Sequence, residues 1–361
     1  MKKEIVILHI SQIDDSLSSG VAVVVPEHLA SQSKYVNIGL LKLNDNDNIK
    51  TNKKYLTFEY KNEYQKISLL PEPFNRPDLV VFHEIYRPQY IMLSKELTKI
   101  KVPYIIVPHG GLMKSAQKKK WYKKIPANIL VLRKFYKNAK AIQYLSDTEK
   151  QKSILKNKTS FVSGNGVTIK NTIVNDDCQK YFNMIYIGRY DIYYKGLDIL
   201  LSACGSIKEE MEKNNILLNL YGVGEDKKIL KAMVEKYSLE NSVKVNGPIY
   251  GKEKEKVLRE SKIFIQTSRS EGQPLSILEA LSYGLPIIAT PGTTFTSEIE
   301  ENHLGFTTEL NKFKIASTIL LSYKNRNTLN RISKNAQNYI AEKYDWTIVS
   351  KKAIEQYKKY F

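Results

Sequence analysis

Short runs of apolar, often β-branched residues alternate along the whole chain with longer stretches in which apolar residues recur at helical spacing. In the first half, the runs that predict strands are Ile5–Ile10, Val36–Leu40, Leu79–Phe82, Tyr104–Val107, Ala141–Leu145 and Ser160–Val162. In the second half they are Met184–Ile187, Leu217–Tyr221, Val243–Val245, Ile263–Gln266 and Ile287–Ala289, with helices expected near 196–214, 226–237, 251–261 and 274–283. Because strands separated by such helices form parallel βαβ units, the pattern predicts an α/β chain of two doubly wound, Rossmann-like domains.

The boundary between the two series is expected within 165–179, where Asn, Asp, Thr and Gly cluster. We therefore predict one domain over 1–168 and a second over 169–345, and a length of 361 residues suits two domains. Hydrophobic residues make up 42% and charged residues 26%, which excludes collagen-like and disordered classes. The longest apolar runs, such as Val21–Val25, are far shorter than the roughly 20 residues of a membrane-spanning helix.

The net charge of +19 is concentrated in the first half of the chain. Residues 1–170 hold 29 Lys/Arg and 14 Asp/Glu, whereas residues 171–361 hold 27 and 23. The segment Lys114–Lys140 carries ten Lys/Arg and no acid, with Trp121, Tyr122, Phe135 and Tyr136 among them. Such a field attracts nucleic acid, anionic lipid or a phosphorylated substrate, and the alternative is a lysine-rich solvated surface. Interleaved aromatics and cations suit a membrane interface or single-stranded nucleic acid.

The two cysteines, Cys178 and Cys204, do not have the spacing of metal ligands. We expect both to be reduced, partly buried thiols of a cytoplasmic protein. The N-terminus runs directly into a strand-like segment without the apolar stretch of a signal peptide, so no export is expected.

Two glutamates flank the start of a helix in the second half. A strand ends at Gln266, a loop turns through Glu271 and Gly272, and a helix begins near Pro274 with Glu279 inside it. The helix start offers amides to hydroxyls or phosphates, and the two carboxylates could hold two ends of one polar ligand. The alternative is a capping glutamate followed by an ordinary helix glutamate.

Cations and glycines follow two other predicted strands. Arg189 and Lys195 lie beside a predicted helix start, where bidentate Arg and a Lys point charge suit a diphosphate. His109 precedes Gly110 and Gly111, which allow a ligand to approach the backbone closely. The alternatives are two exposed surface cations and a structural histidine.

Together these motifs resemble the family 4 retaining glycosyltransferases of bacterial polysaccharide assembly, which have the GT-B fold of two facing Rossmann-like domains with a cleft between them. The resemblance covers nearly the whole chain. Its anchors are Gly20, His109, Ser163–Val167, Gly188-Arg189, Lys195-Gly196, Tyr221–Gly224, Glu271 with Glu279 eight positions later, Tyr283–Ala289 and Trp346, which begins a helix (~346–361) expected to pack back on the first domain. The chain departs from the family at Ser19-Gly20, where two glycines are common, and at Gln273-Pro274, where an aromatic and a glycine are common. The second departure leaves the identity of the sugar open.

The resemblance implies a role for each matched position. Arg189 and Lys195 would hold the donor diphosphate, Glu279 would bind the ribose hydroxyls as a buried carboxylate, and Glu271 and His109 would contact the transferred sugar. Further donor-binding positions that it implies are Gly20, Gly222, Gln273, Pro274 and Leu275. It implies no cofactor and no metal, since the cations would stabilise the leaving diphosphate.

The expected function is therefore transfer of a sugar, with retention, from a UDP- or GDP-linked donor to a saccharide acceptor. The charge asymmetry favours a lipid-linked acceptor and a peripheral position at the cytoplasmic face of an anionic membrane. One alternative is a same-fold enzyme with a soluble acceptor, of the sugar-phosphate synthase type. A second is a basic nucleic-acid-binding protein, which would leave the Glu, Arg and Lys motifs unexplained.

Overall fold

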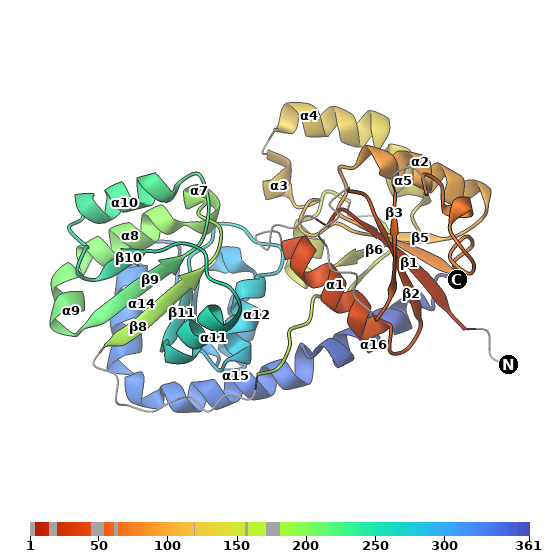
Figure 1. The fold of residues 1–361 in the computed structure, drawn as a ribbon. Helices are drawn as coiled ribbons and strands as arrows, with labels where there is room; N and C mark the ends of the chain where they lie inside the picture. The colour runs from red at the N-terminus through yellow and green to blue at the C-terminus, as the bar shows by residue number, and fades with distance from the viewer. Residues whose placement is uncertain are drawn as a thin grey trace. The chain divides into compact units, whose positions relative to one another are not determined.

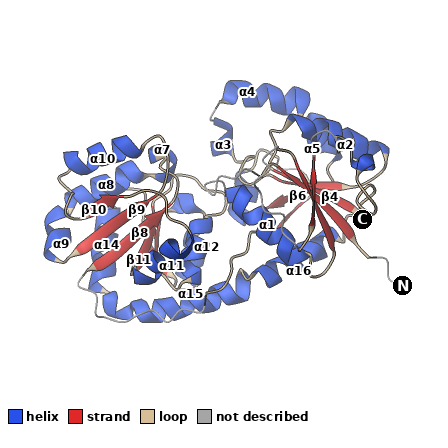
Figure 2. Cartoon of the chain, viewed as in Figure 1, coloured by secondary structure: helices blue, strands red, loops and turns tan. Residues whose placement is uncertain are grey.

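The computed structural model describes residues 4–13, 20–44, 54–60, 64–118, 120–155, 158–170 and 181–361. The chain divides into two compact units, one of Met1–Gly166 with Trp346–Phe361 and the other of Val167–Asp345. Each unit is a parallel sheet covered by helices (Figures 1 and 2).

The sheet of the first unit has the strand order β3-β2-β1-β4-β5-β6-β7. Its strands are β1 (Val6–Ser11), β2 (Asn37–Lys42), β3 (Leu56–Glu59), β4 (Leu79–His83), β5 (Tyr104–Val107), β6 (Ala141–Tyr144) and β7 (Ser160–Val162). Its helices are α1 (Gly20–Gln32), α2 (Pro88–Lys99), α3 (Lys114–Lys118), α4 (Trp121–Pro126), the π-helical η2 (Ala127–Val131), α5 (Arg133–Asn138), α6 (Asp147–Lys152) and α16 (Trp346–Tyr357).

Successive side chains of these strands point to opposite faces of the sheet. One face carries Leu8, Val80 and Phe82 into an apolar core with α2 and α5. The other face carries the buried polar side chains of His9 and Gln143, which bond to α1 and α16 respectively. The first unit therefore has one apolar layer and one layer with a polar centre.

The sheet of the second unit has the order β10-β9-β8-β11-β12-β13. Its strands are β8 (Phe182–Ile187), β9 (Ile216–Tyr221), β10 (Val243–Val245), β11 (Ile263–Gln266), β12 (Ile287–Ala289) and β13 (Gly305–Thr307). Its helices are α7 (Ile192–Lys195), α8 (Leu197–Ser206), α9 (Lys208–Lys213), α10 (Lys227–Lys236), α11 (Gly251–Glu260), α12 (Leu275–Ser282), α13 (Thr296–Glu301), α14 (Lys312–Lys324) and α15 (Leu329–Lys343). Alternate strand residues point into two separate hydrophobic cores, one on each face of the sheet. Met184 and Ile263 pack in one core with α8, α10 and α14. Ile185 and Phe264 pack in the other with α12, α13 and α15.

The predicted class of two doubly wound parallel sheets is confirmed. Two strands were not expected, β3 and β13, because both are short edge strands that lack a continuous apolar run. The expected helix over 196–214 is divided at Ile207 into α8 and α9.

None of the described helices combines the length and the apolar character needed to cross a bilayer. Cys204 is a free thiol that is fully rather than partly buried, and burial raises its pKa to about 12. Cys178 lies outside the described residues.

Candidate functional site

The loop after β8 is anchored by two tyrosines, Tyr186 on the strand itself and Tyr190 in the loop. The Tyr186 hydroxyl donates to the carbonyl of Arg189 at 2.9 Å, and the Tyr190 hydroxyl donates to the carbonyl of Leu220 at 2.7 Å. Asp191 caps the following α7 by accepting from the amide of Tyr194 at 3.1 Å. These bonds set the backbone from which Arg189 and Lys195 project.

Gly196 brings α7 against the end of β11. It adopts a left-handed φ of +65°, and a Cβ on it would lie 2.0 Å from the carbonyl oxygen of Thr267. The Thr267 hydroxyl in turn bonds to the Gly196 carbonyl at 3.2 Å. Only glycine fits this contact, so the contact places Lys195 beside the loop that follows β11.

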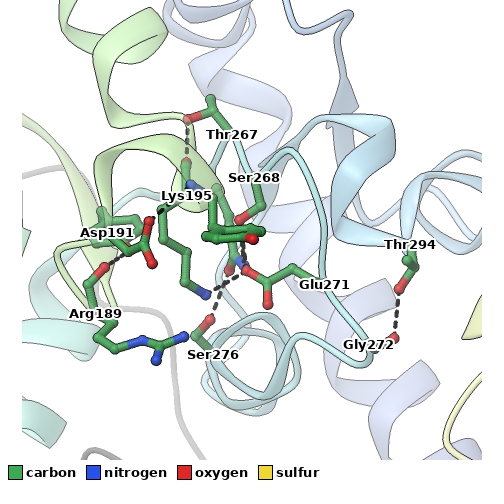
Figure 3. Close-up of polar contacts among 12 residues, drawn as sticks. Arg189, Asp191, Lys195, Thr267, Ser268, Glu271, Gly272, Ser276 and Thr294 are labelled. Atoms are coloured by element: carbon green, nitrogen blue, oxygen red, sulfur yellow. Dashed lines mark hydrogen bonds and ion pairs between the residues drawn. The ribbon is translucent and has the colours of Figure 1, made fainter. Parts of the chain in front are cut away.

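Lys195 and Glu271 form the centre of the site (Figure 3). The Nζ of Lys195 lies 2.5 Å from Oε1 of Glu271, and both side chains are about 15% exposed. The same carboxylate oxygen accepts from the Ser268 hydroxyl at 2.7 Å and from Nε2 of Gln266 at 3.0 Å. The Ser276 hydroxyl donates to Oε1 of Gln266 at 2.7 Å. Glu271 is therefore oriented by three donors and joined through Gln266 to the first turn of α12.

Arg189 extends toward the same region. Figure 3 shows its guanidinium and the Lys195 ammonium directed toward the side of the site where Ser276 lies. Pro274 is the N-cap of α12, and its carbonyl accepts from the amides of Ile277 and Leu278. Two cations and a helix start thus face one region, an arrangement suited to an anionic, hydroxyl-bearing ligand.

Glu279 lies further along α12. Its Oε2 is 2.5 Å from Nζ of Lys254 on α11, and its side chain is 33% exposed. The expectation of a buried carboxylate is therefore wrong, because α11 covers Glu279 only in part and supplies a cation to it. A ribose would meet an ion-paired carboxylate at this position.

Gly222 has a packing role. Its amide donates to the carbonyl of Gly247 at 3.1 Å, and a Cβ on it would lie 1.9 Å from the carbonyl oxygen of Gly188. Gly222 lets the loops after β8 and β9 approach, and its N–H is already engaged within the protein.

Two predicted site residues belong to the first unit. Gly20 is the first residue of α1, and the residues directly before it lie outside the described part of the chain. His109 follows β5 with a left-handed φ of +48°, and its Nε2 lies 3.0 Å from Nδ1 of His83. The next amide, of Gly110, donates to the buried carboxylate of Glu149. His109 is thus held at both its ring and its backbone.

The structure brings together Arg189, Lys195 and Glu271, with Gln273, Pro274 and Leu275 at the start of the adjacent α12. Sequence reasoning assigned no role to Gln266 and Ser268, which orient Glu271, or to His83, which bonds to His109. A polar residue ending an otherwise apolar strand was the available signal for Gln266 and His83. Among the described residues, no group of three or more His, Cys, Asp or Glu side chains is arranged to hold a metal ion.

Comparison with known proteins finds matches to part of this chain. Residues 174–339 match the family model described as glycosyl transferases group 1. An uncharacterized glycosyltransferase of Methanocaldococcus jannaschii, MJ1069, is 28% identical over 189 residues, which is 51% of this chain and 46% of that protein. The amylovoran biosynthesis glycosyltransferase AmsD of Erwinia amylovora is 33% identical over 121 residues, 34% of this chain and 32% of that protein.

The chain spans less than half of the length of either relative. Among solved structures, Anabaena HepE, determined in complex with UDP and glucose, is similar with a TM-score of 0.75 at 14% identity, covering 99% of this chain and 100% of HepE. That likeness shows the fold, which is GT-B. Residues 174–339, which include Arg189, Lys195, Glu271 and Glu279, are therefore similar to the group 1 glycosyltransferases, in a chain with the GT-B fold.

Proposed function

We propose that this protein is a retaining glycosyltransferase that moves a sugar from a UDP- or GDP-linked donor to a saccharide acceptor. The observation that carries the proposal is the cluster of Arg189, Lys195 and Glu271 at the start of α12, inside the region similar to group 1 glycosyltransferases. HepE, which has the same fold, was determined with UDP and glucose bound.

The cations act on the leaving group. Cleavage of a glycosyl–phosphate bond leaves positive charge on the anomeric carbon and negative charge on the departing diphosphate. Arg189 and Lys195, held in place by the loop after β8 and by Gly196, stabilise the charge that develops on the diphosphate. The reaction is proposed to need no divalent cation, since these two side chains supply the positive charge.

The remaining polar groups bind the donor. Glu279 accepts hydrogen bonds from the ribose hydroxyls, and Glu271 faces the transferred sugar. When the donor binds, its diphosphate competes with Glu271 for Lys195, and the Gln266 and Ser268 bonds keep Glu271 in place. His109 and Gly20 of the first unit are proposed as further donor contacts, His109 to the sugar and Gly20 to the phosphates.

The test of this proposal is a donor screen. UDP and GDP release is measured from a panel of nucleotide sugars, with and without membrane extract as the source of acceptor. We expect one nucleotide class to be turned over, and faster with extract. Turnover with a soluble sugar phosphate alone would favour the sugar-phosphate synthase alternative, and no release from any donor would contradict the proposal.

We also propose that the acceptor is lipid-linked, as in cell-surface polysaccharide assembly, because of the surface formed by α3, α4, η2 and α5. Within it, Lys114, Lys118, Lys120, Lys123, Arg133 and Lys134 are exposed. Large apolar side chains are exposed beside them: Trp121, Tyr122, Ile125, Ile129, Leu130 and Val131, with Leu130 at 79%. Cations with exposed aromatic and aliphatic side chains suit an anionic lipid surface, where each Lys or Arg contributes about 1 kcal/mol.

Liposome sedimentation tests the lipid surface. We expect the protein to sediment with anionic vesicles and weakly with neutral ones, and reversal of Lys118, Lys120 and Lys123 to Glu to abolish sedimentation. Reversal of Lys228, Lys231 and Lys236, which are exposed on α10 of the second unit, changes the net charge equally and serves as the control. Equal loss in both triple variants would show that net charge alone, rather than this surface, attracts the vesicle.

A further inference from the structure

Four of the five histidines of the chain form one hydrogen-bonded row in the first unit. His109 Nε2 lies 3.0 Å from His83 Nδ1, and His83 Nε2 lies 2.9 Å from His9 Nδ1. His9 Nε2 lies 3.0 Å from Oε1 of Gln32, and Nε2 of Gln32 lies 2.9 Å from Nε2 of His28. The row crosses the neighbouring strands β1 and β4 and ends in the loop after β5.

The row is buried except at its end. His9, His28, Gln32 and His83 are at most 3% exposed, whereas His109 is half-buried. Burial lowers the pKa of His9 to about 3 and that of His28 to about 4, and it lowers the pKa values of His83 and His109 as well. Each ring is therefore neutral at pH 7 and carries a single N–H. A row of neutral imidazoles can donate in one direction or in the other, but not in both.

The carbonyl oxygen of Ser163 determines in which direction the hydrogen bonds of the row donate. The carbonyl oxygen of Ser163 can only accept, so the group of Gln143 that lies 2.8 Å from it is the amide Nε2. The Oε1 of Gln143 then faces Tyr357, whose hydroxyl donates to it at 2.8 Å. Tyr357 has no second proton, so its oxygen can only accept from Gln32, and the Gln32 side chain accordingly opposes the rise in the Tyr357 pKa that burial causes. The amide of Gln32 thus points to Tyr357 and His28, and its oxygen points to His9.

The same logic continues through the rings. His9 donates from Nε2 to Gln32 and therefore accepts at Nδ1. His83 donates from Nε2 to His9 and accepts at Nδ1, and His109 donates from Nε2 to His83. The proton of His109 is consequently on Nε2, and its Nδ1 holds a lone pair. None of the described residues forms a hydrogen bond with His109 Nδ1.

We propose that Gln32 is a positioning residue that acts through His9 and His83 to hold His109 as its Nε2–H tautomer, so that Nδ1 accepts a hydrogen bond from a hydroxyl group of the sugar donor. The identity of the ligand rests on the proposed function, whereas the tautomer rests on the hydrogen bonds alone. The left-handed backbone of His109 and the Gly110–Glu149 bond fix the direction of the ring. Without the row, an imidazole would exchange between tautomers and lose part of this preference.

Long-range ¹H–¹⁵N correlation spectra of the full chain, labelled with ¹⁵N-histidine at pH 7.5, test the tautomers. Signals are assigned from single histidine-to-glutamine variants. We expect the Nε2–H pattern for His9, His83 and His109 and the Nδ1–H pattern for His28. The exposed His303 of the second unit is the internal reference for an imidazole that exchanges freely. A proton on Nδ1 of His109 would overturn the proposal.

Two variants remove the hydrogen bonds that orient the row. Gln32→Met keeps the length of the side chain and removes its polar groups, and Tyr357→Phe removes the oxygen that orients Gln32. In both we expect His109 to show a mixed tautomer pattern and kcat/KM for nucleotide release to fall about five- to tenfold, the effect of one weakened hydrogen bond. Ser31→Ala is the matched control, because Ser31 is buried on the same helix and bonds to the Trp346 carbonyl outside the row.

The two proposals fail in different ways. An unchanged His109 tautomer in both variants, or a mixed tautomer without a change in kcat/KM relative to Ser31→Ala, would overturn the role of Gln32. Absence of nucleotide release from every donor, with the wild-type tautomers as expected, would contradict the proposed function and leave the hydrogen-bond direction standing.

Discussion

Replacing Gly196 by alanine is expected to damage both the stability of the second unit and the placement of Lys195. Two penalties add at this position. Alanine at φ +65° costs about 1–2 kcal/mol because its Cβ crowds the backbone in the left-handed region. The added Cβ would also lie 2.0 Å from the Thr267 carbonyl oxygen, which is backbone and cannot rotate away, and such overpacking costs about 1–3 kcal/mol.

The chain contains controls that separate the two penalties. Gly251 has φ +54° with nothing within 4 Å of its built Cβ, and Gly247 has open space without a left-handed φ. Gly251→Ala should therefore cost about 1–2 kcal/mol and Gly196→Ala about 2–5 kcal/mol. Gly247→Ala should change stability little. For a domain of this size each kcal/mol lowers Tm by about 2–4 °C.

Calorimetric melting of the three variants measures the loss of stability as a decrease in Tm. Titration with UDP or GDP measures the nucleotide affinity of the site. We expect the decrease in Tm for Gly196→Ala to be about twice that for Gly251→Ala, and nucleotide affinity to fall in Gly196→Ala alone. If Gly196→Ala has the same Tm as Gly251→Ala, the close approach to Thr267 does not hold Lys195 in place and the reasoning fails.

Arg189→Ala and Lys195→Ala should each lower kcat about 10²-fold, with a smaller effect on KM. The double variant should lose less than the product of the two single effects, because both side chains act on one leaving group. A rise in KM alone would argue against the leaving-group role. Glu279→Ala should weaken UDP or GDP binding about tenfold in calorimetry, a modest loss because the side chain is 33% exposed and already paired with Lys254. Unchanged affinity would remove Glu279 from the ribose site. Turnover should persist in EDTA, and a complete loss restored by Mg²⁺ or Mn²⁺ would show that the cations of the chain do not suffice.

The apolar runs predicted β1, β4, β5, β8 and β11 to within one or two residues at each end, because a strand buried on both faces needs a continuous apolar sequence. The same reasoning did not predict the edge strands β3 and β13. Each is exposed on part of its surface, so burial does not demand an apolar residue at every position. Glu279 illustrates a limit of another kind, since its partial exposure depends on how α11 covers it.

The proximity of Arg189, Lys195 and Glu271 could be expected from the chain alone, because they follow β8 and β11 and the ends of parallel strands meet at one edge of a sheet. The order of strands and helices is encoded locally, in runs and spacings of a few residues. The hydrogen bonds that orient the site are encoded locally only in part: Ser268 and Gln266 lie within five residues of Glu271, whereas other bonds join residues far apart in sequence. Lys195 meets Glu271 across 76 positions, and Tyr357 meets Gln143 across 214. No spacing rule connects such residues, so the contact of Lys195 with Glu271 forms only when α7 packs beside the end of β11, and the proton position that we propose for His109 depends on the packing of β1, β4, α1 and α16.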